Sequence, residues 1–327
     1  MLTADVASIW DIIVYNAGFI VVKPTSVSKL LYRMIPPIIT RLTGADDQRA
    51  LNVAIKVLRK QNVEINLTAL NTERFLGGRN YFEKAERWFA PKDGETCDRQ
   101  QQNNCAVVVH NDWIVTKEAK VYRFREHLMW MYDGDDKYYS SNARLYLTYI
   151  NQEPTFLRDN LSRDEQSAIM TSEINALKTA MTIGYLLNRT VVLPRFHTGR
   201  RASESPLNLV LHVKSFDDEF AGKYRENSFL RHPKVPNEVK YGLSKGRHYL
   251  MIDRLRNAAK PSKNIFISVD DIQYHFGHVK TKVLEIGSLQ NVNVVFRNSS
   301  EDVQFGKKLS RAFYRSDYRQ YKRHKRY

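Results

Sequence analysis

The first 130 residues alternate short apolar runs with segments in which apolar residues recur every three or four positions. The helical spacing is clearest over residues 46–59, which are predicted to form an amphipathic helix. An earlier helix is predicted to start at Thr25 or Ser26 and to end at Pro36-Pro37, because proline interrupts the hydrogen bonds of a helix. The apolar runs predict strands over 9–22, with a turn at Asn16-Ala17-Gly18, over 63–67, and over 107–109 as a buried strand. Strands that alternate with helices indicate a layered α/β fold.

The second half of the chain shows the same alternation. Ser162 and Glu165 form a capping-box pattern at the start of a helix that is expected to reach Leu187, with a break near Thr171-Ser172. Short apolar runs predict strands over 191–193, 209–213, 265–269 and 292–296. Residues 132–142 are polar and interrupt the pattern, so we place a domain boundary there.

The positive charge of the chain is concentrated in its second half. Of the net charge of +16, residues 1–150 contribute +3 and residues 151–327 contribute +13. The expected organisation is a first α/β domain over 1–132, a linker over 133–142, a basic α/β domain over 143–306 and a cationic tail over 307–327. Basic regions commonly meet acidic polysaccharide, anionic membrane or nucleic acid. Nucleic acid is the least favoured partner, because nothing outside the tail suits a nucleic-acid-binding module.

Candidate chemistry follows the apolar run at 107–109. The next residues are His110, Asn111, Asp112 and Trp113, and the cations Lys117, Lys120, Arg123 and Arg125 come soon after them. An imidazole that can bind a metal, followed by several cations, suits a nucleotide diphosphate that carries a divalent metal. The alternative is a His that ends a strand beside a solvated basic helix, since His-x-x-Trp is not a specific motif.

Four segments follow one another in a recognisable order. They are Asn16 to Phe19 (NAGF), Asp47 to Asn52 (DQRALN), Phe75 to Phe82 (FLGGRNYF) and Val109 to Trp130 (VHNDWIVTKEAKVYRFREHLMW). Together they resemble the nucleotide-diphospho-sugar transferase domain shared with plant cell-wall xylosyltransferases. Asp112 replaces the second Asn of that family's usual closing signature, and Thr116 stands where Gly is common.

The resemblance implies a fold, an activity and a set of roles. The fold is a partial GT-A-like domain, and the activity is transfer of a sugar from a nucleotide-diphosphate donor to a hydroxyl of a glycan or protein in the Golgi lumen. The implied roles are His110 as ligand of Mn²⁺ or Mg²⁺, Asp47 and Gln48 as the catalytic pair, and Asn16, Gly18, Asn111, Lys117, Lys120 and Arg123 as donor and diphosphate contacts. A favourable helix N-terminal charge also explains Asp47, and turn chemistry also explains Asn16 and Gly18 and the Gly77-Gly78 pair.

One departure from the family concerns the metal. The family's Asp-x-Asp motif does not precede Asn16, and the pair Asp133 and Asp135 lies in the expected linker, where a solvated turn explains it. The chain is therefore expected to be the C-terminal part of a glycosyltransferase domain, with a catalytically inactive glycan- or polyanion-binding protein as the alternative. No signal peptide or membrane span is visible, so a full-length form is expected to carry its anchor elsewhere, as a type II membrane protein.

The second half carries a shorter resemblance. Residues 172–197 (SEINALKTAMTIGYLLNRTVVLPRFH) resemble the start of an O-fucosyltransferase-like GT-B domain, although the segment is also a generic helix-to-strand connection. His197, Arg200 and Arg201 follow Pro194, where they could meet an anionic ligand at the carboxyl end of a strand. A basic surface loop is the simpler interpretation of these three residues.

Two further patterns bear on the compartment. The spacing of Cys97 and Cys105 suits a local disulfide in an oxidising lumen, with two free thiols as the alternative. Asn-x-Ser/Thr sequons, which favour a secreted glycoprotein, occur at Asn66, Asn160, Asn188 and Asn298. Asn188 directly precedes an apolar run and is interpreted as structural.

Overall fold

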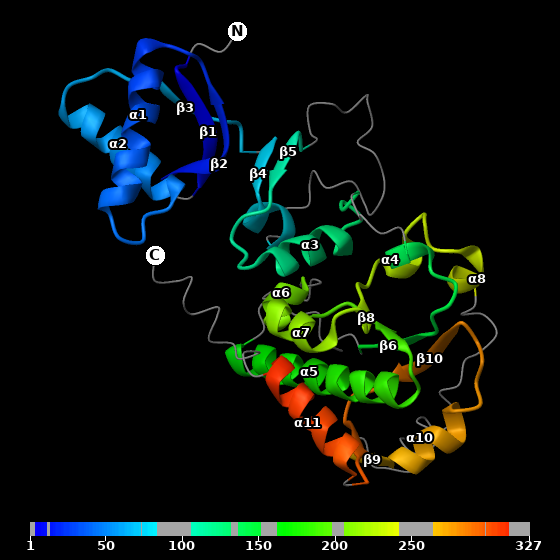
Figure 1. Ribbon diagram of the computed structural model, residues 1–327. Helices are drawn as coiled ribbons and strands as arrows, with labels where there is room; N and C mark the ends of the chain where they lie inside the picture. The colour runs from blue at the N-terminus through cyan, green and yellow to red at the C-terminus, as the bar shows by residue number, and fades with distance from the viewer. Residues whose placement is uncertain are drawn as a thin grey trace. The chain divides into compact units, whose positions relative to one another are not determined.

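The chain folds into two compact units, Met1–Ile114 and Val115–Tyr327, which we term unit 1 and unit 2 (Figure 1). The computed structural model describes residues 4–11, 14–72, 74–83, 106–131, 137–151, 162–197, 206–241, 264–297 and 299–313. The division falls before the linker expected at 133–142. Residues Lys137–Ser140 of that segment form helix α4, and Tyr139 on it is buried, so this part of the predicted linker belongs to the packed structure of unit 2.

Unit 1 contains a three-stranded sheet with the order β2-β1-β3. Strand β1 (Val6–Asp11) pairs antiparallel with β2 (Val14–Val22) and parallel with β3 (Leu67–Ala69). The strand predicted at 63–67 therefore lies later in the chain. The predicted turn at Asn16-Ala17-Gly18 is wrong, because β2 runs through these residues.

A bulge replaces the predicted turn. Ser8 pairs with Ile20, whereas Trp10 pairs with Tyr15, so β2 holds more residues than β1 between the two pairs. A bulge bends its strand and re-aims side chains. The sequence Asn-Ala-Gly was predicted to be a turn between two strands. It forms instead an irregular stretch of backbone inside one strand, β2.

Two helices cover this sheet. α1 (Ser26–Arg41) and α2 (Asp47–Lys60) pack against each other, and their first turns are capped by the side chains of Thr25 and Asp46. The apolar positions predicted for α2 are confirmed. The core of unit 1 consists of Val6, Leu31, Leu51, Ala54, Ile55 and Leu58.

The prediction that the first helix ends at Pro36-Pro37 is wrong, since α1 continues to Arg41. Both prolines and the residues four positions before them are exposed, so water can hydrogen-bond the carbonyl groups that lose their helical partners. Ile35 and Ile38 pack against the core of unit 1 on either side of the prolines. Burial of this apolar face holds the helix where local propensity would end it.

A separate parallel pair carries the remaining motifs of unit 1. Strand β4 (Phe75–Gly77) pairs with β5 (Val108–His110), and a short π-helix (Arg79–Glu83) follows β4. The strand expected at 107–109 forms at Val108–His110, but the expectation that it is buried is wrong. Val107 is 54% exposed and the next two valines are half-buried, because among the described residues β5 pairs with β4 alone.

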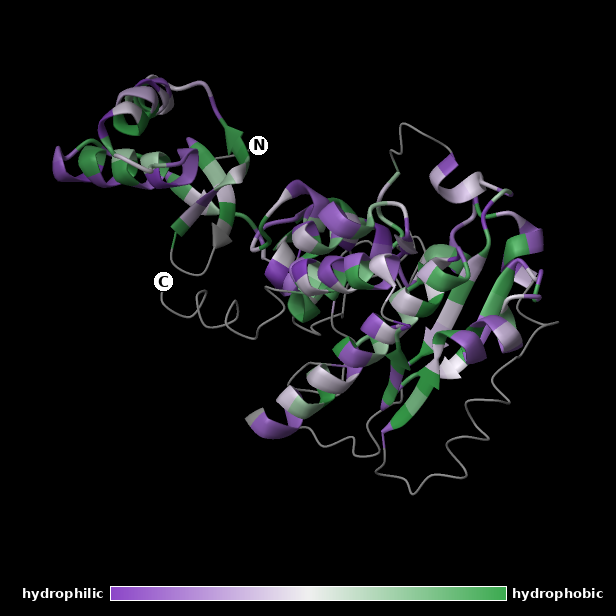
Figure 2. Cartoon of the chain, turned by 60° about the horizontal axis from the view of Figure 1, so that its bottom comes forward, coloured by the Kyte–Doolittle hydropathy of each residue, from purple (hydrophilic) through white to green (hydrophobic). Residues whose placement is uncertain are grey.

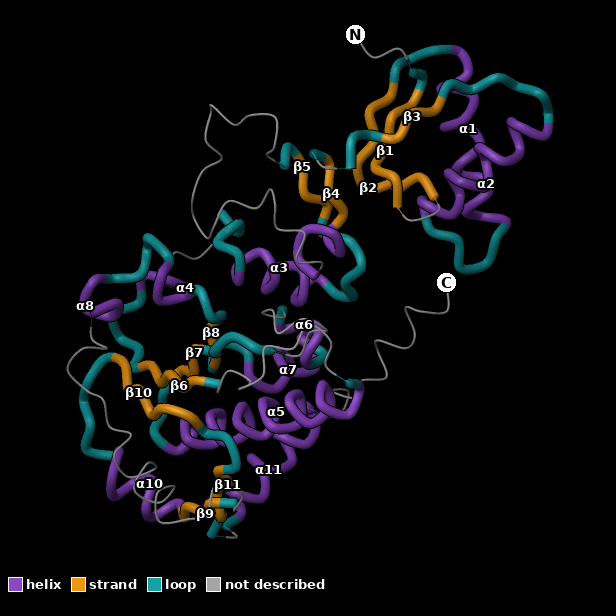
Figure 3. The backbone as a smooth tube through the Cα atoms, turned by 180° about the vertical axis from the view of Figure 1, so that it is seen from behind, coloured by secondary structure: helices purple, strands orange, loops and turns teal. Residues whose placement is uncertain are grey.

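Unit 2 is built on a four-stranded sheet in which every pair is parallel. The order is β10-β6-β7-β8, formed by Val283–Ser288, Tyr146–Ile150, Thr190–Val192 and Tyr224–Arg225 (Figure 3). A second parallel pair joins β9 (Ile265–Ser268) to β11 (Val292–Val295). These two strands confirm the predictions at 265–269 and 292–296. Hydrophobic strands lie among helices that are hydrophilic in part (Figure 2).

The long helix of unit 2, α5 (Arg163–Leu186), begins with the predicted capping box of Ser162 and Glu165. It runs without the break expected near Thr171-Ser172. The strand predicted at 209–213 is wrong, because helices α6 (Leu207–Val210) and α7 (Val213–Phe220) occupy this region. Residues 307–313 of the expected tail belong to helix α11 (Ser300–Phe313). The other helical segments are α3 (Lys117–Glu126), the 3-10 turn η4 (Phe229–Arg231), α8 (Asn237–Lys240) and α10 (Val269–Phe276).

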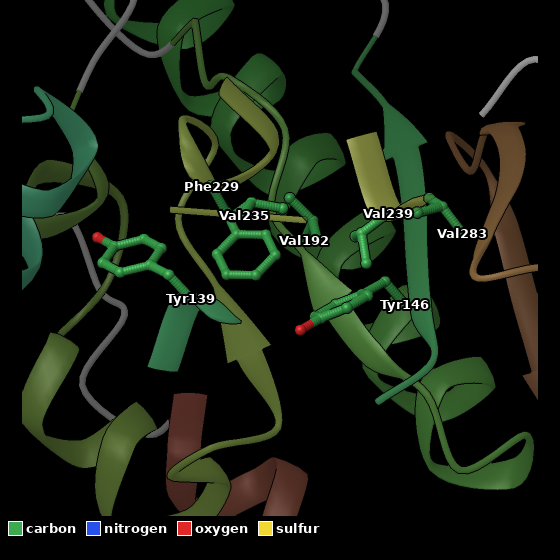
Figure 4. Packing of buried hydrophobic residues seen from close by; sticks show 7 residues of the cluster. All are labelled: Tyr139, Tyr146, Val192, Phe229, Val235, Val239 and Val283. Atoms are coloured by element: carbon green, nitrogen blue, oxygen red, sulfur yellow. The ribbon is translucent and has the colours of Figure 1, made fainter. Parts of the chain in front are cut away.

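Aromatic packing supports one face of the parallel sheet (Figure 4). The ring of Phe229 lies between those of Tyr139 and Tyr146, with centroid distances of 5.7 and 5.0 Å. The hydroxyl of Tyr139 donates to the fully buried carboxylate of Glu226 at 2.9 Å. The polar end of this ring is thereby satisfied inside an apolar cluster.

Helix α3 is held in unit 2 by buried polar groups. The Nε of Arg123 donates to Oδ1 of Asn208 at 3.2 Å, and a carboxylate oxygen of Glu126 accepts from the backbone N–H of Leu207 at 3.1 Å. Thr116, which caps α3, has a φ of 78°. Glycine adopts a backbone with positive φ more readily than threonine, so this position is one where Gly would fit without strain.

Burial raises the pKa of Glu126 from 4.5 to about 8, while the bond from Leu207 and the charge of Arg123 act in the opposite direction. Between these two values the folded chain holds a proton that the unfolded chain has lost, so this group's contribution to stability falls as the pH rises. We expect the free energy of unfolding of unit 2 to fall over this window by at most roughly 1.4 kcal/mol per pH unit, and Glu126→Gln to flatten the decline. Urea unfolding near pH 5 and near pH 8 measures the decline in the free energy of unfolding. An equal decline in Glu126→Gln would show that Glu126 does not cause it.

Candidate functional site

The bulge of β2 is organised by the buried side chain of Asn16. Its Oδ1 accepts the N–H of Gly18 at 2.6 Å, and its Nδ2 donates to Oδ2 of Asp112 at 3.3 Å. Its backbone carbonyl accepts the hydroxyl of Ser8 at 2.6 Å. Both heavy atoms of the amide are bonded inside the protein, so Asn16 holds the bulge in shape and links it to the segment after β5.

His110 lies directly against the backbone of Gly18. A Cβ atom at Gly18 would lie 2.1 Å from Cε1 and 2.2 Å from Nε2 of the imidazole, far inside van der Waals contact. Gly18 itself is exposed and His110 is half-buried, so the ring lies at an accessible surface. Two of the predicted site residues, far apart in sequence, are thus in contact.

Asp112 joins a third motif to the same place. Its Oδ1 accepts the N–H of Gly78 at 2.5 Å, and its Oδ2 accepts the Asn16 amide. A Cβ atom at Gly77 would lie 3.0 Å from Oδ2, so the glycine pair lets the backbone approach this carboxylate. The Gly77-Gly78 pair therefore allows close packing around Asp112, and Gly77 ends strand β4, so the turn interpretation of this pair is not borne out.

The start of α2 reaches the bulge through Gln48. The Oε1 of Gln48 accepts the N–H of Ala17 at 3.3 Å, and Asn52, one turn later, exchanges hydrogen bonds with the backbone of Tyr15 at 3.0 and 2.8 Å. Asp47 is exposed, and its Oδ1 accepts the N–H of Gln48 at 2.8 Å. Gln48 thus supports the bulge, while Asp47 presents a carboxylate at the helix N-terminus beside it.

A cation stands at the same site. The guanidinium of Arg79, directly after the glycine pair, lies 5.6 Å from the ring centroid of Trp113, which follows Asp112. Trp113 adopts a φ of 54°, so the chain turns sharply after Asp112. Asn111 is buried just before it.

The predicted diphosphate contacts of the closing signature lie in unit 2. Lys117 and Lys120 are exposed on α3. Arg123 is fully buried and bonded to Asn208, so its predicted contact with a diphosphate is at odds with the structure. Sequence spacing suggested a surface cation, but this position faces the interior of unit 2.

Within the part of the chain that the structure describes, no three His, Cys, Asp or Glu side chains converge as metal ligands. His110 has Asp112 close to it in sequence, but both oxygens of that carboxylate already accept hydrogen bonds. The described residues therefore do not supply a complete protein-held metal site. Asp133, Asp135, Cys97, Cys105, Arg200 and Arg201 lie outside the described residues.

Asp112 should not tolerate replacement by the amide that the resembled family carries. An asparagine has one accepting oxygen, so Asp112→Asn would turn an N–H group toward either Asn16 or Gly78, both donors. We expect unit 1 to lose about 1–3 kcal/mol of stability. Urea unfolding measures the loss, with exposed Glu64→Gln as the matched acid-to-amide control. An unchanged stability would show that Asp112 does not hold the motifs together.

Residues 4–124 match the family model of nucleotide-diphospho-sugar transferases. The matched region contains the bulge of β2, the glycine pair, His110 and Asp112, and it ends within α3. No characterised protein and no solved structure matches the chain. The mixed α/β structure with parallel strands is consistent with such a domain, and the match indicates glycosyltransferase activity.

Two residues of the site were not selected from the sequence. Asp112 was named among the residues that follow the apolar run and as a departure from the family's closing signature, but it was given no role, and Arg79 was present only within the third segment. Their importance comes from contacts with residues distant in sequence. The sequence offers one signal for each residue: Arg79 directly follows the glycine pair, and Asp112 lies two positions after the candidate metal ligand His110.

Proposed function

We propose that this chain transfers a sugar from a nucleotide-diphosphate donor to a hydroxyl group of a glycan or protein. The observation that carries the proposal is the convergence, inside the matched region, of three motifs: the Asn16–Gly18 bulge, the Gly77-Gly78 pair and the His110–Asp112 segment. These motifs are separated by many residues in sequence, and only the fold of unit 1 brings them together.

The reaction needs a site that favours the departing diphosphate. The bond between the anomeric carbon and a diphosphate oxygen breaks, a bond to the acceptor oxygen forms, and the acceptor hydroxyl loses its proton. In the proposed arrangement, His110 and Arg79 lie at the diphosphate and stabilise its growing negative charge. Asp47 is the proposed base for the acceptor proton, and Gln48 positions the bulge beside it.

A divalent metal belongs to this proposal only through the family resemblance. A bound Mn²⁺ or Mg²⁺ would screen the diphosphate charge, with His110 as one ligand. The described residues lack a complete ligand set, so further ligands would have to come from the donor, from water or from residues outside the described ranges. Inhibition of turnover by EDTA, with recovery on addition of Mn²⁺, would support metal dependence.

We also propose a GT-A-like fold for the domain, a basic second domain and a tail that binds polyanions, and a place in the Golgi lumen. The tail beyond Phe313 and the sequons at Asn160 and Asn298 lie outside the described residues. Over the described residues, no helix has the length and apolar composition needed to cross a membrane.

The direct test incubates the full chain with UDP-glucose, UDP-galactose, UDP-xylose, GDP-fucose and GDP-mannose and measures released UDP or GDP. Release from one or more donors supports the proposal. The alternative, a catalytically inactive protein that binds polyanions, draws on the net charge of +16. No release from any donor, together with salt-sensitive retention on heparin, would favour that alternative.

A further inference from the structure

Unit 2 contains a cavity of about 800 Å³ beside the C-terminal end of α5, which we term the α5 cavity. Residues of four helices, α5, α7, α10 and α11, line it together with the turn between α5 and β7 (Figure 1). All of these lining residues belong to unit 2. The volume lies within the range of roughly 300–1,000 Å³ that is typical of small-molecule pockets, so the cavity is large enough for a short saccharide.

The ring of Tyr185 gives the α5 cavity an accessible aromatic surface. It stacks on the ring of Phe305 with a centroid distance of 4.2 Å and an angle of 15° between the planes. Phe305 is 4% exposed, whereas Tyr185 is 46% exposed, so the buried ring holds the exposed one in a fixed orientation. The face of an aromatic ring is negatively polarised and attracts the C–H groups of a sugar ring.

Polar side chains without internal partners surround this ring. Lys223, Lys308 and Glu301 line the α5 cavity and are exposed. None of the three forms a hydrogen bond or an ion pair with another described residue. The two lysines can donate hydrogen bonds and the glutamate can accept them, which suits the hydroxyl groups of a sugar. The cavity therefore combines an aromatic face with free donors and a free acceptor.

Asn188 lies at the rim of the α5 cavity, directly after α5. Its backbone N–H donates to the carbonyl of Tyr185 at 3.2 Å, and its φ is 49°. Asparagine tolerates this left-handed backbone better than most residues, which supports the structural interpretation of Asn188. Its side chain, however, is exposed and makes no hydrogen bond with another described residue. The turn thus uses the backbone of Asn188 and leaves its amide free.

Asn188 is also the first residue of the sequon Asn188-Arg189-Thr190. Such a sequence is the acceptor of N-linked glycans in secreted proteins. Thr190 lies in β7 and is only 5% exposed, so transfer of a glycan has to precede the formation of this strand, on the nascent chain. Once the strand has formed, the asparagine side chain still lies at the surface, where an attached glycan has room.

We propose that Asn188 carries an N-linked glycan whose first sugars pack in the α5 cavity against the exposed ring of Tyr185. In the transfer, Nδ2 of Asn188 attacks C1 of the first sugar of a polyprenyl-diphosphate-linked oligosaccharide. The bond between nitrogen and C1 forms, the bond between C1 and the diphosphate oxygen breaks, the diphosphate leaves with the electron pair, and Nδ2 loses one proton. A membrane-bound oligosaccharyltransferase catalyses this step, so the proposal rests on the luminal location that belongs to the proposed function.

The covalent link explains why a shallow set of contacts is sufficient. A sugar attached at the rim meets the cavity as part of the same molecule, and short flexible linkers give effective concentrations in the millimolar range. Stacking on Tyr185 and a few hydrogen bonds from Lys223 and Glu301 then hold the first sugars in place. The same contacts with a free saccharide would bind it weakly.

Two variants separate attachment of the glycan from its packing. Thr190→Val removes the sequon with a residue of the same shape that favours a strand, and it leaves Asn188 in its turn. We expect it to abolish the glycan on the peptide that contains Asn188. Tyr185→Ser keeps the sequon and removes the aromatic face. Its control is Tyr274→Ser, which removes a ring that is 78% exposed on α10 and does not line the cavity.

The experiment directs the full chain into the secretory pathway of human cells with an appended signal peptide. The purified native chain is treated with peptide N-glycanase, which converts a glycosylated asparagine to aspartate, so mass spectrometry of the Asn188 peptide follows release. A packed glycan has to leave the cavity before it is cleaved, and its release slows in proportion to the packed population. We expect release from native Tyr185→Ser to be at least roughly tenfold faster than from the wild type, and Tyr274→Ser to match the wild type.

The absence of a glycan on Asn188 in the wild-type chain would overturn the proposal. Equal release from wild type and Tyr185→Ser would show that the glycan extends into solvent, and it would overturn the packing. If Tyr185→Ser lowers the melting temperature, Glu301→Ala decides: it removes an exposed side chain, and release should rise by about threefold for the loss of one hydrogen bond. A glycan at Asn188 in a chain that turns over no nucleotide sugar would contradict the transferase function alone.

Discussion

Replacing His110 with alanine is expected to reduce donor turnover by at least roughly 100-fold, because the variant loses a group placed at the departing diphosphate. His110 ends β5 and is half-buried, with its ring on Gly18. Removing this ring leaves the buried bonds of Asn16 and Asp112 in place, so the melting temperature of unit 1 should change little. The measurement is release of UDP or GDP from the best donor found for the wild-type chain.

The matched control is His275→Ala, which removes an exposed imidazole from α10 in unit 2. Its turnover should equal that of the wild type. If His110→Ala turns over donor at the wild-type rate, the histidine is structural and the proposed reaction centre is misplaced. If wild-type turnover also persists in EDTA, the metal assignment fails separately.

The second large effect is expected from Gly18→Ala. The added Cβ would overlap the imidazole of His110, with the closest approach at 2.1 Å. The ring is the end of a rotatable side chain, so it can swing away at little cost to stability, but it then leaves the site. A displacement of about 1 Å from the reactive position can cost roughly 100-fold in rate, and we expect a loss of that order.

Gly306→Ala provides the control for this glycine substitution. Gly306 lies within α11, and a Cβ there meets nothing within 4 Å. Alanine at this position should stabilise the helix by about 0.5–1 kcal/mol and leave turnover unchanged. Wild-type turnover in Gly18→Ala would show that the contact between Gly18 and His110 has no part in the reaction. A large loss of stability in that variant would show that the ring cannot move.

The matched region and the physical division of the chain do not end at the same place. The family match reaches residue 124, whereas unit 1 ends at Ile114. Helix α3 bridges this difference, because Arg123 and Glu126 on it are buried among residues of α6 in unit 2. Lys117 and Lys120 lie on the same helix, so their positions depend on the packing of α3 within unit 2.

Local patterns in the sequence determined the parts of the fold that depend on near neighbours. The spacing of Leu51, Ala54, Ile55 and Leu58 determined α2 and its buried face, and Ser162 with Glu165 determined the start of α5. The family resemblance over residues 16–130 also followed from the sequence, and the family match covers most of that region. Capping and helical periodicity are read within a few residues, so sequence alone reveals them.

Tertiary structure decided the rest, because the deciding contacts join distant segments. Packing of Ile35 and Ile38 against the core keeps α1 helical beyond Pro36-Pro37. Packing of α3 within unit 2 buries Arg123. The site itself depends on Asp112 meeting Asn16 and Gly78, and on His110 meeting Gly18. Such contacts depend on how the elements pack, and the free energy of burial and hydrogen bonding in that packing outweighs the local preference of any single segment.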